Sequence, residues 1–166
     1  KLDIVTKKNI ILFLPNFSPG GAAASIIRMI KKIDKNKFNI FVISIGKNFY
    51  KKTLNQYCKK IIELHSNRTF SSFLKIIKII INFKKEKIIF ISNINYANVL
   101  SLVFLKIIYK FKNLKLVLIE RTPLNELTTY YDFIDFFKKK IVISLIYIFY
   151  KKADLIICNS LKASSD

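Results

Sequence analysis

The chain has 166 residues, of which 52% are hydrophobic, and its 30 Lys and Arg against 10 Asp and Glu give a formal net charge of +20. This length and apolar content allow one domain with a substantial core and exclude an intrinsically disordered chain. The positive charge indicates an anionic partner, such as nucleic acid, phospholipid or a phosphorylated substrate. A general enrichment of the chain in Lys, Ile, Asn, Phe and Tyr explains about half of the positive charge.

The first predicted elements are a strand at residues 10–14, a glycine loop and a helix that includes residues 26–30. Gly20, Gly21 and Ala22 lie in this loop, where paired glycines let the backbone approach a ligand and the helix start attracts phosphate. The loop therefore predicts an anion site, and a plain tight turn is the alternative. It lacks both the Lys-Ser/Thr of a P-loop and the third glycine of the dinucleotide fingerprint.

The later apolar segments continue to alternate in type along the chain. β-Rich runs at 38–45, 61–64, 87–92, 116–119 and 153–159 predict strands. Helical spacing predicts helices at 70–83 and 96–111 and a long or broken helical region over 123–150. Because strands alternate with helices, we expect an α/β fold with a doubly wound parallel sheet.

Three segments, in this order, are similar to the N-terminal lobe of family 4 glycosyltransferases, which are retaining enzymes of the GT-B fold. They are residues 18–22 (Ser-Pro-Gly-Gly-Ala), residues 119–123 (Ile-Glu-Arg-Thr-Pro) and residues 150–160, where Ala-Asp precedes an apolar run and a serine. The resemblance implies that residues 1–166 form a single Rossmann-like acceptor-binding domain. We expect it to be truncated at its C-terminal end and inactive alone, because most of the nucleotide sugar would bind a second lobe.

The function implied is transfer of a sugar from a nucleotide-sugar donor to a lipid-linked or surface-polysaccharide acceptor. We expect no cofactor and no metal, because helix dipoles and basic side chains can stabilise the leaving diphosphate. The expected partners are the nucleotide sugar, the lipid-linked or glycan acceptor and an anionic membrane surface. Nucleic acid is not expected as a partner, because the lysines are dispersed and no nucleic-acid motif occurs.

The resemblance also implies roles for single residues. Gly20, Gly21 and Ala22 fall on the loop beside the donor diphosphate. Glu120 and Arg121 fall on a catalytic position at the end of the fifth strand. There the carboxylate would orient an acceptor hydroxyl or take its proton, and the guanidinium would hold a phosphate or sugar oxygen. The alternative is a simple ion pair between these two side chains.

Arg68, Asn95 and Asn98 are further candidates for contact with the acceptor. Arg68 lies near the start of a basic helix, where helix capping by Asn67 or Ser66 is the alternative explanation. The two asparagines follow the fourth strand, where turn chemistry explains them as well.

Lys138, Lys139 and Lys140 precede an apolar run in the helical region, and we expect them to contact an anionic membrane. The alternative is that these lysines only face water. With no span of about 20 apolar residues and no visible secretion signal, the expected location is the cytoplasm, peripherally on the inner face of the cell membrane. Cys58 and Cys158 form no metal or disulfide pattern, and we expect Cys158 to be a buried, reduced thiol.

Two other function classes compete with the glycosyltransferase. One is a basic nucleic-acid- or membrane-binding α/β protein without catalysis. The other is a dinucleotide-binding enzyme, which the missing third glycine and the absence of an acidic residue at the end of the second strand argue against.

Overall fold

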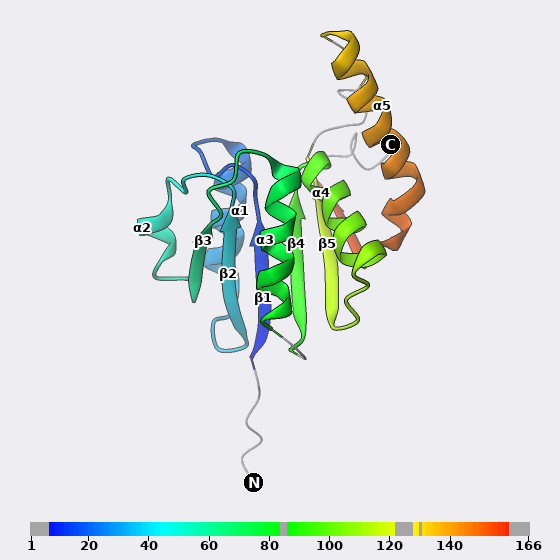
Figure 1. Ribbon diagram of the computed structural model, residues 1–166. Coiled ribbons are helices and arrows are strands. Elements are labelled where there is room, and N and C mark those ends of the chain that lie inside the picture. Colours follow the sequence, from blue (N-terminus) through cyan, green and yellow to red (C-terminus); the bar gives the residue numbers. More distant parts are fainter. Residues whose placement is uncertain (1–6, 84–85, 122–127, 130, 160–166) are drawn as a thin grey trace. The chain divides into compact units, whose positions relative to one another are not determined.

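A computed structural model describes residues 7–83, 86–121, 128–129 and 131–159. Six strands form one parallel sheet in the order β3-β2-β1-β4-β5-β6 (Figure 1). The strands are β1 (Lys8–Phe13), β2 (Phe38–Ser44), β3 (Lys60–Glu63), β4 (Ile88–Asn93), β5 (Leu114–Glu120) and β6 (Leu155–Cys158). This sheet confirms the predicted α/β fold class, which is Rossmann-like in its strand order.

The helices alternate with the strands along the chain. They are α1 (Gly21–Lys32), α2 (Lys51–Leu54), α3 (Thr69–Ile81), α4 (Asn95–Ser101) and α5 (Phe133–Phe149). A π-helical segment, η1 (Leu102–Ile108), continues α4, and a 3₁₀ turn, η3 (Tyr150–Lys152), follows α5. The contacts divide the chain into two compact units. The first unit comprises residues 1–91 and 113–115, and the second comprises residues 92–112 and 116–166.

The core of the first unit surrounds β1, whose residues Asn9 to Phe13 are all buried. A central parallel strand is covered on both faces, which explains why its apolar run is unbroken rather than alternating. Helices α1 and α3 cover opposite faces here (Figure 1). Phe13 of β1 meets Phe73 of α3 edge to face, with 5.5 Å between ring centroids, and also contacts Phe90 of β4.

In the second unit, α4 and α5 pack together through Val99, Val142 and Ile146. β5 pairs with β6 so that Glu120 lies beside Cys158. Asp154 fixes the start of β6, because its backbone N–H donates to the Leu116 carbonyl while its carboxylate accepts from the Leu116 N–H. These contacts join α4, α5, β5 and β6 within the second unit.

The structure departs from the sequence-based expectations at three places. Helix α2 was not predicted, and the helix expected at 96–111 widens into the π-helical η1. The expected buried thiol at Cys158 is wrong: β6 is an edge strand, its first three side chains are exposed and Cys158 is half-buried. Part of the helical region expected at 123–150 lies outside the described residues, and α5 begins at Phe133, where the Asp132 carboxylate accepts from the Asp135 N–H at 2.6 Å.

Candidate functional site

Buried polar side chains gather in the second unit where β4 and β5 end. Asn93 is the last residue of β4, and Glu120 is the last residue of β5. Asn95 and Asn98 lie three residues apart on α4, so they share one face of that helix. All four side chains are buried, with at most 5% of any residue exposed. Together with Arg121 and Tyr150 they form the polar cluster.

Three donors converge on the carboxylate of Glu120. The Tyr150 hydroxyl donates to Oε2 at 2.6 Å, and Asn98 Nδ2 donates to the same oxygen at 3.3 Å. Asn98 Nδ2 is also 3.1 Å from the Ile119 carbonyl, and the Arg121 backbone N–H donates to Oε1 at 3.2 Å. The carboxylate is therefore held in place by its neighbours, which suits a group that positions other side chains.

Tyr150 belongs to the polar cluster but was not among the residues predicted from the sequence. Burial, followed by the neighbouring Glu120 carboxylate, raises the pKa of its phenol well above the ordinary value. The phenol therefore stays protonated and keeps donating to the carboxylate. No local signal marks it, since it ends an aromatic, apolar helix 30 residues from Glu120 and only the fold brings the two together.

The Arg121 guanidinium points to the end of β4. Its Nη2 donates to Asn93 Oδ1 at 3.2 Å, and its backbone N–H donates to Glu120 Oε1 at 3.2 Å. Arg121 thus links the ends of β4 and β5, which is more than the simple ion pair considered from the sequence.

Asn95 has a buried amide group with no partner. Only 4% of the residue is exposed, and among the described residues neither Nδ2 nor Oδ1 has a hydrogen-bond partner. The Oδ1 atom of Asn98 is likewise buried and unpartnered there. A buried polar group left without a hydrogen-bond partner lowers stability by about 1–3 kcal/mol. The three unpaired atoms, which are the Oδ1 atoms of Asn95 and Asn98 and Nδ2 of Asn95, therefore need an explanation.

The backbone at the cluster is strained. Ile94, between β4 and α4, has φ 80° and ψ 132°. A β-branched residue rarely adopts a positive φ, and such strain gathers at functional sites because other contacts must maintain it. The strained peptide directly precedes Asn95, so it sets the direction in which that side chain leaves the backbone.

The predicted glycine loop lies in the first unit. Gly20 is extended, with φ 161°, and Gly21 is the first residue of α1. A Cβ atom added to either would meet nothing within 4 Å, so neither glycine is needed for a turn. The helix start also has no side-chain cap and no acidic residue in its first turn. Gly20, Gly21 and the half-buried Ala22 therefore leave free backbone N–H groups at an uncrowded helix end.

The remaining predicted residues have separate places. Arg68 is exposed in the first unit and is itself the N-cap of α3, without a side-chain cap bond from any described residue. On α5, Lys138 and Lys140 are exposed. Lys139 instead pairs with Asp135 at 2.8 Å. Of the predicted site residues, the structure thus brings four together in the polar cluster: Asn95, Asn98, Glu120 and Arg121.

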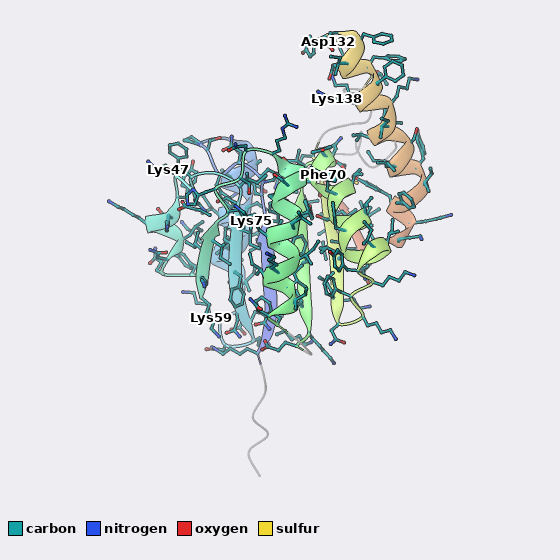
Figure 2. All side chains as sticks on the ribbon, in the orientation of Figure 1. Lys47, Lys59, Phe70, Lys75, Asp132 and Lys138 are labelled. Carbon is teal, nitrogen blue, oxygen red and sulfur yellow. The ribbon has the colours of Figure 1, made fainter. Side chains whose placement is uncertain are left out.

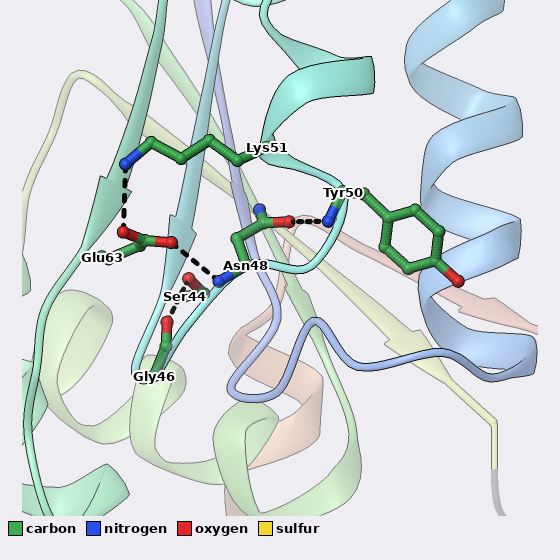
Figure 3. A network of polar contacts seen from close by, with 6 residues as sticks. All are labelled: Ser44, Gly46, Asn48, Tyr50, Lys51 and Glu63. Carbon is green, nitrogen blue, oxygen red and sulfur yellow. Dashed lines mark hydrogen bonds and ion pairs between the residues drawn. The ribbon is translucent and has the colours of Figure 1, made fainter.

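A second polar network, in the first unit, fastens the loop after β2 (Figure 3). The Asn48 N–H donates to Glu63 Oε1 at 2.8 Å, and Lys51 Nζ lies 3.0 Å from Oε2. Asn48 Oδ1 in turn accepts from the Tyr50 N–H at 2.9 Å, just before α2 begins. The N–H of Asn48 and then Lys51 lower the pKa of Glu63 below its ordinary value. Two of these bonds tie the loop and α2 to the end of β3, and the third stays within the loop, which identifies the network as structural.

No protein-family model matches the chain, and neither a curated protein nor a solved structure is significantly similar to it. Across the part of the chain that the structure describes, no three His, Cys, Asp or Glu side chains gather as a metal site would require. None of the described helices is long and apolar enough to cross a membrane.

Proposed function

We propose that this chain is the acceptor-binding lobe of a glycosyltransferase that moves a sugar from a nucleotide sugar to a lipid-linked or polysaccharide acceptor. The observation that carries the proposal is the buried, unpartnered amide of Asn95 beside the Glu120 network. The Rossmann-like sheet supports it, because such folds bind ligands beyond the carboxyl ends of their strands.

The open atoms of the polar cluster favour a hydroxylated ligand. The Oδ1 atoms of Asn95 and Asn98 both need a donor, and Asn95 Nδ2 needs an acceptor. A sugar hydroxyl both donates and accepts, whereas a fully ionised phosphate only accepts and would leave both Oδ1 atoms unpaired. The cluster is therefore suited to the acceptor sugar and not to the diphosphate of the donor.

Glu120 acts in this proposal as a positioning residue. Its carboxylate fixes Nδ2 of Asn98, so the Oδ1 atom of the same amide is directed away from Glu120. Tyr150 holds the carboxylate through the same oxygen, Oε2. Arg121 and Asn93 fix the neighbouring strand end in the same way. The catalytic role predicted for Glu120 and Arg121 remains a prediction.

The donor side of the proposal rests on the start of α1. Uncapped N–H groups at a helix N-terminus bind phosphate, and a glycine at position 21 leaves their approach open. A second lobe would supply most of the remaining donor contacts.

A buried water could satisfy the Asn95 amide instead, and replacement of Asn95 by leucine in the full-length protein separates the two explanations. If the amide serves the acceptor, Asn95→Leu removes an unsatisfied polar group, so the protein keeps or gains stability. The KM for the acceptor should rise about tenfold while the KM for the nucleotide sugar stays constant. Unchanged kinetics together with lower stability would identify a structural water site and contradict the proposal.

Asn98→Leu is the comparison variant for stability, because the amide nitrogen of Asn98 is bonded whereas that of Asn95 is not. Asn98 is fully buried and its Nδ2 bonds Glu120 and the Ile119 carbonyl. Its loss should lower stability by about 1–3 kcal/mol, because buried acceptors are left unpaired. If both variants are less stable than the natural protein and both keep its KM for the acceptor, the polar cluster has only a structural role.

A dinucleotide-binding enzyme is the second candidate, because dinucleotide-binding folds have the same strand order. Their ribose is held by an acidic residue at the end of the second strand. β2 ends instead in Ser44, whose hydroxyl donates to the Gly46 carbonyl. Tight binding of NADH by the full-length protein, without any response to a nucleotide sugar, would favour this second function.

A further inference from the structure

Helix α5 exposes an unusual amount of apolar surface. Of its 17 residues only Val142 and Ile146 are buried, and these two pack against α4. Figure 2 shows side chains projecting from the end of the helix that carries Asp132 and Lys138. The exposed large apolar side chains of the helix are Phe133, Ile134, Phe137, Ile141, Tyr147 and Ile148.

Five of these six side chains share one side of the helix. Each residue advances about 100° around a helix axis, so positions 133, 134, 137, 141 and 148 fall within one third of the circumference. Val142 and Ile146 fall on the opposite side, which is the face that packs on α4. The stripe, defined by Phe133, Ile134, Phe137, Ile141 and Ile148, is therefore directed away from the face that anchors the helix. Phe133 and Phe137 also touch edge to face, with 4.7 Å between centroids.

The three adjacent lysines divide into two kinds. Lys139 is turned to Asp135, donates to the Thr129 carbonyl at 2.6 Å and lies over the Tyr131 ring at 5.1 Å. Lys138 and Lys140 are exposed, and the helical spacing puts one at each border of the stripe. The sequence predicted membrane contact for all three lysines. In the structure Lys138 and Lys140 are placed for such contact, whereas Lys139 is bonded to other residues of the chain.

We propose that this stripe and its bordering lysines, Lys138 and Lys140, dock α5 in the interface of an anionic phospholipid membrane. Long lysine side chains can reach lipid phosphates from both borders while the apolar residues enter the acyl boundary. The only acidic residue within α5, Asp135, is bonded to Lys139, so no exposed carboxylate on the stripe opposes an anionic surface. The net charge of +20 adds attraction to the same surface.

Other occupants fit this surface less well. A second copy of the chain, packed stripe to stripe, would bring the Lys138 and Lys140 pairs of both copies together, and like charges oppose such contact. A nucleic acid would use the lysines and leave Ile134, Ile141 and Ile148 in water. Membrane docking accounts for both the apolar stripe and its charged borders.

The test is flotation of the full-length protein with phosphatidylcholine vesicles, with and without phosphatidylglycerol. We expect recovery with the vesicles that contain phosphatidylglycerol, and at least about tenfold weaker partition for Lys138→Glu/Lys140→Glu, since each lysine strengthens such binding about fivefold. Phe137→Ser/Ile141→Ser should weaken it similarly. Both pairs are exposed, so the fold should be retained.

Lys59→Glu/Lys60→Glu, a pair of adjacent exposed lysines in the first unit, makes the same change in net charge and is the matched control. We expect it to retain most of the partition. Equal loss in both lysine pairs would mean that only net charge matters and would overturn the proposal. Absence of vesicle binding, or self-association abolished by Phe137→Ser/Ile141→Ser, would overturn it too. The experiment measures binding to vesicles and not sugar transfer. Its outcome therefore neither supports nor contradicts the proposed glycosyltransferase function, which is tested by the Asn95 variant.

Discussion

Ile94 has a backbone conformation that its side chain disfavours, and it precedes Asn95, whose amide has no hydrogen-bond partner among the described residues. We expect Ile94→Gly to release this strain. A left-handed backbone costs an L-residue about 1–2 kcal/mol, whereas glycine loses roughly 0.5–1 kcal/mol through its greater freedom in the unfolded chain. The variant should therefore be as stable as the natural protein or more stable, as measured by urea unfolding.

Ile94→Ala is the control, because it removes the same side chain but keeps a Cβ atom at the positive φ. It should be less stable than Ile94→Gly. If both variants lose the same stability, the strain at this turn is not a feature of the protein. If the strain directs Asn95, Ile94→Gly should also weaken acceptor binding.

The site could be predicted from the sequence only in part. Asn98, Glu120 and Arg121 were identified because polar residues at strand ends are visible against apolar runs. Tyr150 was not, since its partner lies 30 residues away and the contact depends on how α5 ends. The burial of Glu120 was also not visible, although it changes the interpretation from a surface ion pair to a carboxylate with several donors.

At the scale of elements, the sequence pattern located the strands and α3 within a few residues of their ends. The helical region expected at 123–150 contains α5, but α5 begins only at Phe133. Helix α2 was missed, because its four residues Lys-Lys-Thr-Leu contain one apolar position and show no helical period. The loop before it is fixed by the Asn48 and Glu63 network, which joins segments 15 residues apart. Short helices of this kind depend on tertiary contacts more than on propensity.

This network makes stability depend on pH. The lowered pKa of Glu63 means that its ionised form is favoured in the folded state. Its stabilising contribution is therefore present above the unfolded pKa of about 4.3 and is lost as the pH falls through the folded value. Glu63→Gln should cost about 1–2 kcal/mol at pH 7, and the difference from the natural protein should shrink below about pH 4, as measured by urea unfolding at both pH values.

Lys51→Met separates the two contributions to this effect. The hydrogen bond from the Asn48 N–H is the largest single cause of the lowered Glu63 pKa, followed by the hydrogen bond from Lys51, whose side chain is half-exposed. Removal of the Lys51 amine should thus cost less than about 1 kcal/mol. A loss as large as that of Glu63→Gln would assign the stabilisation to the ion pair.

For the whole molecule, the alternation of strands and helices predicted the doubly wound sheet, because buried parallel strands need crossover helices. The order of the strands was not contained in that pattern, since local sequence does not determine which strand lies beside β1. The sequence left open whether the apolar residues of α5 pack in the core or contact a membrane, because the two cases look alike until the packing partners are known.

The central claim, that the polar cluster takes a sugar hydroxyl, is tested most directly by nuclear magnetic resonance of the Asn95 side-chain amide in the full-length protein. The signal is assigned by its loss in Asn95→Leu and followed during titration with methyl glycosides and, separately, with sulfate, an anion that carries no hydrogen-bond donor at neutral pH. We expect a saturable shift with a glycoside and a much smaller one with sulfate, because sulfate can accept from Asn95 Nδ2 but cannot donate to the unpaired Oδ1 atoms. An amide signal that no glycoside moves, or that sulfate moves equally, would contradict the account.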